Sequence, residues 1–285
     1  KIMLYILLSI LLFSFNNVLW KKNLEKLPVS FLVAYRALFT STIALILFFY
    51  FHSETVVSPQ LILRITTGSI FGVIGLFSML SVIQKASLQW LGIYNLLGIV
   101  FTSLYLWFFE KVVFNQSIFG LILILMGFIF YIYSNKETQI KITIKQHALL
   151  LLMTMSFSVS SLVHWKNLKS DIPPLLIISN QEIVVFITAF VLTIFKFKTI
   201  KIKEVCKNYF LRVILMALII FLALLFSFLG LKITNPIVSS VLFLASPLTT
   251  ILLSTLIFRE QLTLKNGMAI LIIATGAFIL HYYTV

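Results

Sequence analysis

The chain has 285 residues, of which 61% are hydrophobic and only 11% are charged. Soluble domains carry roughly 25% charged residues. This composition, with a mean hydropathy of +1.10, therefore indicates membrane segments along the whole chain and leaves no room for a soluble domain. The net charge of +14 comes from basic residues between the apolar segments, where lipid headgroups explain them better than nucleic acid does. The single cysteine, Cys206, excludes an internal disulfide and a thiolate metal cluster.

Ten spans are predicted by the hydropathy pattern. A bilayer core about 30 Å thick needs roughly 20 apolar residues for each helical crossing. Helices are the expected element, because lipid offers no partner to an unpaired backbone amide. The first segment lacks a small-residue cleavage site, so we interpret it as a span rather than a signal peptide. The predicted spans are residues 2–20, 29–51, 61–83, 88–109, 116–134, 147–165, 174–195, 209–231, 236–257 and 265–283.

The two halves of the chain share residues that are rare in membrane helices. Trp20 and Pro28 match Trp165 and Pro173 at an offset of 145 residues. Matches at such residues favour an internal duplication over the general similarity of Leu-rich helices. An odd number of spans in each half places the second half upside down in the membrane, and such inverted repeats are typical of secondary transporters.

The predicted fold is therefore an all-α membrane protein with ten transmembrane helices as two inverted five-helix repeats. The first repeat is expected at residues 1–135 and the second at residues 146–285, with the basic segment 136–145 as the loop between them. In such proteins the solute site lies near the middle of the membrane, between the repeats.

The segment from Gly230 to Leu280 resembles the EamA-type members of the drug/metabolite transporter superfamily, which have ten spans. The fourth span departs from the family pattern because it lacks a proline, and Phe13-Ser14 stands where the family often has Trp-Gly. The resemblance implies a secondary transporter of amino acids, amines or other metabolites, driven by exchange or proton coupling. The matching residues are Asn16, Lys21, Lys22, Arg36, Glu110, Gln116, Gly120 and Gly127, then Ser246, Pro247, Glu260, Gly267 and Gly276.

Two charged residues lie inside predicted spans. A charged side chain within a membrane helix is costly, so Arg36 and Glu182 should face the bundle interior. With inverted repeats their depths differ by roughly 10 Å, which a long arginine can largely bridge. The pair is either part of the solute site, with Glu182 as a carrier of a coupling proton, or an ion pair that holds the helices together.

Other polar residues at span depth are candidates for substrate binding or for bonds between helices. His164 lies beside Trp165 near a span end, which favours an interfacial role, and Trp20 and Trp90 fit an aromatic belt at the membrane surface. The additional candidates are Asn16, Asn17, Tyr94, Asn95, His164, Asn180, Gln181, Ser239 and Ser246.

The most favoured function is transport of a small polar metabolite across the cytoplasmic membrane by alternating access. An intramembrane lipid- or metabolite-modifying enzyme and a channel are the alternatives. Asp171 is the only aspartate, which excludes an aspartyl dyad, and no zinc-protease, redox or phosphate-loop motif occurs. We therefore expect no catalytic residues, no metal, no cofactor and no nucleic acid. The expected partners are a small solute, the bilayer and a coupling proton, in a monomer or homodimer.

The resemblance and the charges disagree about membrane orientation. In the family both termini lie in the cytoplasm, whereas cytoplasmic loops generally carry the excess of Lys and Arg. The side that holds the termini carries 6 basic residues and the opposite side carries 15, so the charges lean toward termini outside the cell. The six are Lys1, Arg64, Lys111, Lys166, Lys169 and Lys232; the fifteen are Lys21, Lys22, Lys26, Lys85, Lys136, Lys141, Lys145, Lys196, Lys198, Lys201, Lys203, Lys207, Arg212, Arg259 and Lys265.

Overall fold

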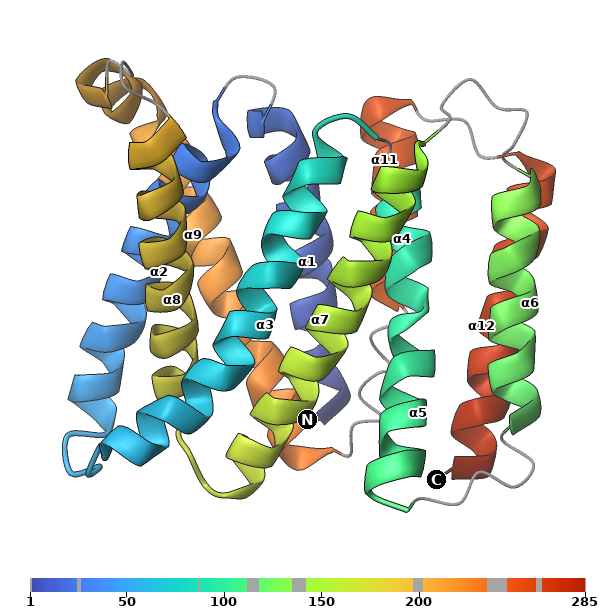
Figure 1. Ribbon diagram of the computed structural model, residues 1–285, viewed down its shortest axis with the longest axis horizontal. Helices are drawn as coiled ribbons and strands as arrows, with labels where there is room; N and C mark the ends of the chain where they lie inside the picture. The colour runs from blue at the N-terminus through green and yellow to red at the C-terminus, as the bar shows by residue number, and fades with distance from the viewer. Residues whose placement is uncertain are drawn as a thin grey trace.

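The structure is a computed structural model, and the helices in it stand side by side across one slab (Figure 1). Every regular element among the described residues is an α-helix. The described residues are 2–24, 27–86, 88–111, 118–134, 142–196, 202–234, 245–259 and 263–284. Residues 136–141 of the predicted loop between the repeats lie outside these ranges.

The helices follow the hydropathy pattern closely. The first half contributes α1 (Ile2–Leu24), α2 (Val29–Phe51), α3 (Pro59–Ile83), α4 (Leu88–Leu96), α5 (Gly98–Phe109) and α6 (Ile118–Ser134). The second half contributes α7 (Ile144–Lys169), α8 (Pro174–Lys196), α9 (Ile202–Ile233), α11 (Ala245–Phe258) and α12 (Leu264–Thr284).

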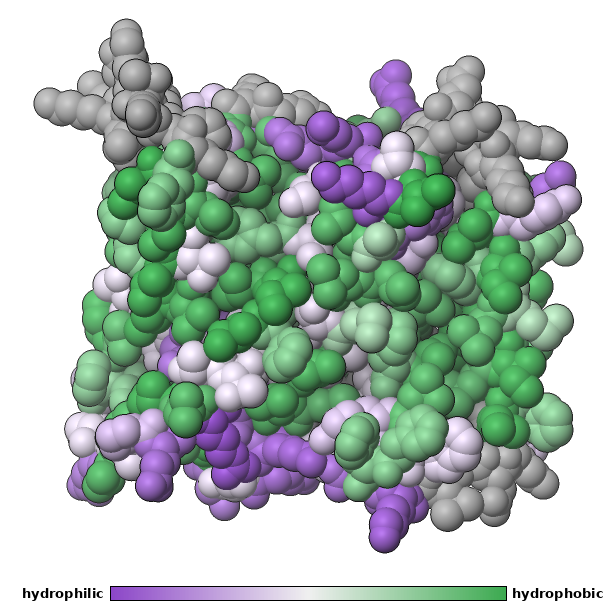
Figure 2. Space-filling view, viewed as in Figure 1, coloured by the Kyte–Doolittle hydropathy of each residue, from purple (hydrophilic) through white to green (hydrophobic). Residues whose placement is uncertain are grey.

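Ten apolar helical segments make up the described part of the chain. Seven are long and apolar enough to cross a membrane, with α4 and α5 counted together as one, and α6, α11 and α12 are shorter. Hydrophobic side chains form a belt around the middle of the visible face, and hydrophilic ones gather at its two rims (Figure 2). This belt matches the requirement of a bilayer core for apolar side chains, so the prediction of a ten-span membrane protein is confirmed.

The two halves are inverted copies of each other. In Figure 1, α1 rises from the lower end, where both termini lie, whereas α7 descends from the upper end. The main helix pairs join the halves: α2 packs on α8, α6 on α12, α3 on α7 and α1 on α9. Exchanging the halves maps the first two pairs onto themselves and the last two onto each other, as a twofold axis in the membrane plane requires.

Glycines let two of these pairs approach closely. A Cβ atom on Gly276 would lie 2.7 Å from the backbone oxygen of Gly120, and one on Gly75 would lie 2.6 Å from the ring of Phe157. Gly75 thus allows α3 to pack closely against α7. Gly267, at the start of α12, faces open space instead.

The fourth span differs from its prediction as one continuous helix over 88–109. It is divided at Leu97 into α4 and α5. The amide of Leu97 donates to the carbonyl oxygen of Tyr94 at 3.1 Å, a tighter i−3 bond that ends α4. Hydroxyls of α7 bond to carbonyl groups on both sides of the break: Thr154 Oγ1 donates to the Tyr94 oxygen at 2.9 Å, and Ser158 Oγ to the Gly98 oxygen at 3.3 Å. Neighbouring hydroxyls thus bond carbonyl groups on both sides of the break, in a span that contains no proline.

Candidate functional site

A cavity of about 330 Å³ lies between the two repeats. Helices α1, α2, α3, α5, α7, α8 and α9 line it, together with Asn95 at the end of α4. Toward the upper end its lining residues Trp20 and Met79 are buried. Among its other lining residues Ser161 is exposed and Ser227 is half-buried. Its volume is in the range of small-molecule sites.

An ion pair joins the repeats at the wall of this cavity. Arg36 on α2 and Glu182 on α8 both line it, with Arg36 Nη1 2.6 Å from Glu182 Oε2. Their side chains are only 2% and 3% exposed. Helices α2 and α8 pack against each other, so the long side chain of Arg36 reaches the carboxylate of Glu182. Desolvation of both charges is expensive, so each depends on the other.

Trp20 supports the arginine. Its ring lies 5.7 Å from the guanidinium carbon of Arg36, and the whole residue is only 1% exposed. The expected position of Trp20 in an interfacial belt is therefore wrong. Its indole packs inside the bundle because a desolvated guanidinium is attracted to the face of an aromatic ring.

Several polar atoms of the cavity have no protein hydrogen-bond partner among the described residues. They are Oδ1 of Asn16, Nε of Arg36 and both ring nitrogens of His164. His164 is 1% exposed and packs edge-on against Phe228, so its expected interfacial role is also wrong. Buried polar groups are normally bonded, which makes these atoms candidates to bond a solute.

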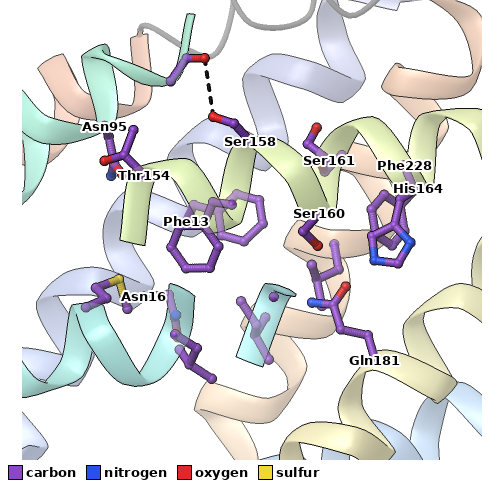
Figure 3. Close-up of a pocket in the computed structure, with 18 of the residues that line it drawn as sticks. Phe13, Asn16, Asn95, Thr154, Ser158, Ser160, Ser161, His164, Gln181 and Phe228 are labelled. Atoms are coloured by element: carbon purple, nitrogen blue, oxygen red, sulfur yellow. Dashed lines mark hydrogen bonds between the residues drawn. The ribbon is translucent and has the colours of Figure 1, made fainter. Parts of the chain in front are cut away.

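Figure 3 shows how the polar side chains divide between two parts of the cavity. Gln181 lies near Ser160 and His164, with Phe228 beside the histidine, whereas Asn95 lies beside Thr154 on the other side of the view and Asn16 lies below them. Of the eleven candidates from the sequence, seven line the cavity. They are Asn16, Asn17, Arg36, Asn95, His164, Gln181 and Glu182.

Asn180 and Tyr94 lie outside the cavity lining and connect helices instead. Asn180 Oδ1 accepts from Ser69 Oγ at 2.8 Å, and its amide donates to Thr66 Oγ1 at 3.1 Å, which fixes α8 to α3. The Tyr94 hydroxyl lies 2.6 Å from Nδ1 of His147, which fixes α4 to α7. Ser239 and the side chain of Ser246 fall outside the described residues.

The hydroxyl-bearing face of α7 is the main feature that the sequence analysis did not identify. Thr154, Ser158 and Ser161 all line the cavity. Their spacing of four and three residues places them on one face of a helix. That spacing within a serine-rich span was the signal available in the sequence. The aromatic residues Phe13 and Phe157 also line the cavity, and in a span rich in phenylalanine nothing distinguishes them.

The sequence profile of the EamA-like transporter family matches residues 1–133 and again residues 145–282. The chain belongs to the EamA-like transporter family. Members of this family are multi-pass membrane transporters of small solutes and not enzymes, so a membrane location and a small-molecule substrate follow for this chain. The resemblance to EamA-type transporters noted in the sequence is thereby confirmed.

A solved crystal structure has the same fold as this EamA-like transporter. It aligns with a TM-score of 0.72 over 99% of this chain and 97% of its own, at 14% sequence identity. At that identity the likeness concerns the fold alone. No curated protein sequence matches the chain.

Proposed function

We propose that this transporter moves a small polar metabolite, such as an amino acid or an amine, through the cavity by alternating access. The observation that carries the proposal is the buried pair of Arg36 and Glu182 on the cavity wall. A guanidinium can bind a carboxylate through two parallel hydrogen bonds, and a carboxylate can bind an amine. The carboxylate of a zwitterionic solute would therefore bind Arg36 in place of Glu182, and its amine would bind Glu182 in place of Arg36.

The unbonded polar atoms near this pair support a polar cargo. Asn16 Oδ1 could accept a hydrogen bond from the solute, and the ring nitrogens of His164 could accept or donate one, where no described residue of the protein supplies a partner. The aromatic residues Phe13 and Phe157, which also line the cavity, would contact an apolar part of the solute. A wide channel for ions would instead call for an open, continuous pore.

Alternating access follows from the repeat in this proposal. Arg36 would belong to the repeat at residues 1–135 and Glu182 to the repeat at residues 146–285. Movement of one repeat against the other would open and close the two sides of the site in turn. Glu182 is the proposed carrier of a coupling proton, because it is the carboxylate of the ion pair that a solute would disturb. A monomer contains the whole cavity, so a homodimer would be optional for transport.

The experiment must separate a transport role of the pair from a purely structural one. Single neutral variants leave an uncompensated buried charge, so we propose the double variant Arg36→Gln/Glu182→Gln, in which neither charge remains. If the pair serves transport, the double variant folds but does not accumulate solute in proteoliposomes. If the pair only joins the helices, the double variant folds and transports.

A matched control is the exposed pair of Lys232 and Asp171, whose atoms are 3.0 Å apart at the lower end. The variant Lys232→Gln/Asp171→Asn should transport at the wild-type rate. The solute itself can be found by a thermal-shift screen, because a ligand at 100 times its dissociation constant stabilises the protein by about 2.7 kcal/mol. For coupling, proton uptake during transport should disappear in Glu182→Gln while any residual solute exchange continues.

A further inference from the structure

One turn toward the lower end of α7 (Figure 1) concentrates buried polar atoms that lack a partner. Among the described residues, nine buried side-chain nitrogen and oxygen atoms have no hydrogen-bond partner in the protein, and five of them belong to this turn. They are both ring nitrogens of His164, Nε1 of Trp165, and both the amide nitrogen and the amide oxygen of Asn167. Buried polar groups are normally bonded, so this concentration indicates a ligand that supplies the bonds.

The polar side chains nearer the upper end of the same helix are bonded within the protein. Thr154 and Ser158 donate to carbonyl groups beside the break in the fourth span, and Ser160 Oγ donates to the backbone oxygen of Gly68 at 2.8 Å. On α7, the buried side-chain polar atoms without a partner are therefore confined to residues 164–167.

Packing, rather than hydrogen bonding, holds His164 in place. Its ring packs edge-on against Phe228, with the ring centroids 5.4 Å apart. On the side of α3, a Cβ atom added to Gly68 would lie 2.7 Å from Cε1 of His164 and 3.0 Å from Nδ1, so the backbone of α3 closes that side of the ring. Asn167 is also only 1% exposed. The polar atoms of both residues are thus held where bulk solvent does not reach them.

The ligand of this turn differs from the solute of the cavity. Of the three residues, only His164 lines the cavity, so a solute there does not account for the free amide of Asn167. His164 and Asn167 are three residues apart on one face of the helix, which places their Cβ atoms about 5–6 Å apart. Water suits such a gap, because it donates and accepts hydrogen bonds and makes about three of them when buried. An amide and an imidazole likewise offer both donors and acceptors.

Asn167 also connects this turn to the lower end of the bundle. Its backbone oxygen accepts from the amides of Ser170 at 3.1 Å and Ile172 at 3.2 Å. Ser170 and Asp171 are exposed. The exposed end of α7 therefore lies about one helical turn from Asn167 and about two turns from His164.

We propose that the turn from His164 to Asn167 binds water and that this water carries protons between the lower end and the cavity. A neutral imidazole takes up a proton at one ring nitrogen and releases a proton from the other, so the ring passes protons on without a net change of charge. Protons that move in this way reach Glu182, which also lines the cavity. The delivery of a coupling proton to Glu182 rests on the proposed function, whereas the water site does not.

Hydroxyl-radical footprinting of the purified protein tests the water site. A brief X-ray pulse generates radicals from water, and these oxidise a buried side chain only where water lies beside it. We expect His164 to be oxidised in the wild type and to lose most of this label in Asn167→Leu, which removes the polar partner. The matched control is Asn23→Leu, because Asn23 is also buried but its amide donates to the Leu19 oxygen at 2.8 Å. This control should leave the labelling of His164 unchanged.

Three results of the footprinting overturn the proposal. They are the absence of label on His164 in the wild type, equal label in the wild type and Asn167→Leu, and the same loss of label in Asn23→Leu. If Asn167→Leu does not fold, Asn167→Met takes its place, because an unbranched methionine adapts to irregular space.

Proton exchange tests the route separately from the water site. In protein labelled with ¹⁵N-histidine, the ring N–H signal of His164 is identified by its loss in His164→Gln. After transfer to D₂O this signal should vanish at once in the wild type and persist in Asn167→Leu. Exchange that is as fast in the variant overturns the proton route, even where footprinting supports the water site. Neither measurement needs a solute, so a failure of the proposed transport function is distinguished from a failure of this proposal.

Discussion

Nη1 of Arg36 and Oε2 of Glu182 lie 2.6 Å apart although the residues are 146 positions apart in the chain. The two side chains come from opposite repeats and meet at the wall of the cavity. Each is almost completely removed from water, so the energetic state of one depends directly on the presence of the other.

Replacing one member of this pair should destabilise the protein more than replacing both. Arg36→Gln or Glu182→Gln alone leaves a buried unpaired charge, which typically costs about 3–5 kcal/mol. The double variant leaves none, so its thermal unfolding in detergent should lie closer to wild type than that of either single variant. If the loss of stability in the double variant equals the sum of the losses in the two single variants, the charges are not coupled.

Trp20→Leu should weaken both stability and transport. The ring interaction with a desolvated guanidinium contributes about 2 kcal/mol, and the smaller side chain leaves Arg36 free to move. Thermal unfolding and the KM for solute would measure the two effects. Trp107 is 49% exposed on the outside of the bundle and is the control, because Trp107→Leu changes only a lipid-facing position. The same loss in both variants would argue against a role for the contact.

Gly276→Ala should destabilise the protein while Gly267→Ala on the same helix should not. A methyl group at Gly276 would meet the backbone of Gly120, and such overpacking typically costs about 1–3 kcal/mol. A methyl group at Gly267 meets nothing within 4 Å, and alanine favours the helix by up to about 1 kcal/mol. The unfolding temperatures of the two variants and the wild type, measured in the same detergent, would test this prediction. Similar stabilities would contradict the close packing of α6 on α12.

Adjacent amides on α8 should respond differently to alanine. Asn180→Ala removes bonds to Ser69 and Thr66, and such bonds in membrane bundles average about 0.6 kcal/mol, so it should lower stability with little change in KM. Gln181 lines the cavity, so Gln181→Ala should raise the KM for solute with little loss of stability. A change of KM in Asn180→Ala alone would reverse these assignments.

The sequence predicted the helices well because each membrane helix is specified by its own residues. Lipid requires every backbone amide to be bonded within its segment, and this leaves a continuous apolar run as a local signal. The break at Leu97 was missed for the opposite reason. The carbonyl groups there are bonded by the hydroxyls of Thr154 and Ser158, which belong to another helix. Nothing in the sequence of the fourth span predicts these bonds.

The sequence correctly predicted the charged residues of the candidate site, but it predicted the positions of the residues around them less well. Arg36 and Glu182 stood out because charge at depth is costly, whatever the helices do. His164 and Trp20 were assigned to the membrane surface from their positions near span ends. Tilt and rotation of α7 and α1 instead bury both against partners from other helices, Phe228 and Arg36.

The sequence by itself determined the ten apolar spans and the duplication, because both depend on residue type along the chain. The tertiary structure decided which polar groups share the cavity and which of them only join helices. These outcomes depend on how each helix is rotated about its own axis. In helices that are hydrophobic on nearly every face, packing against neighbours sets that rotation.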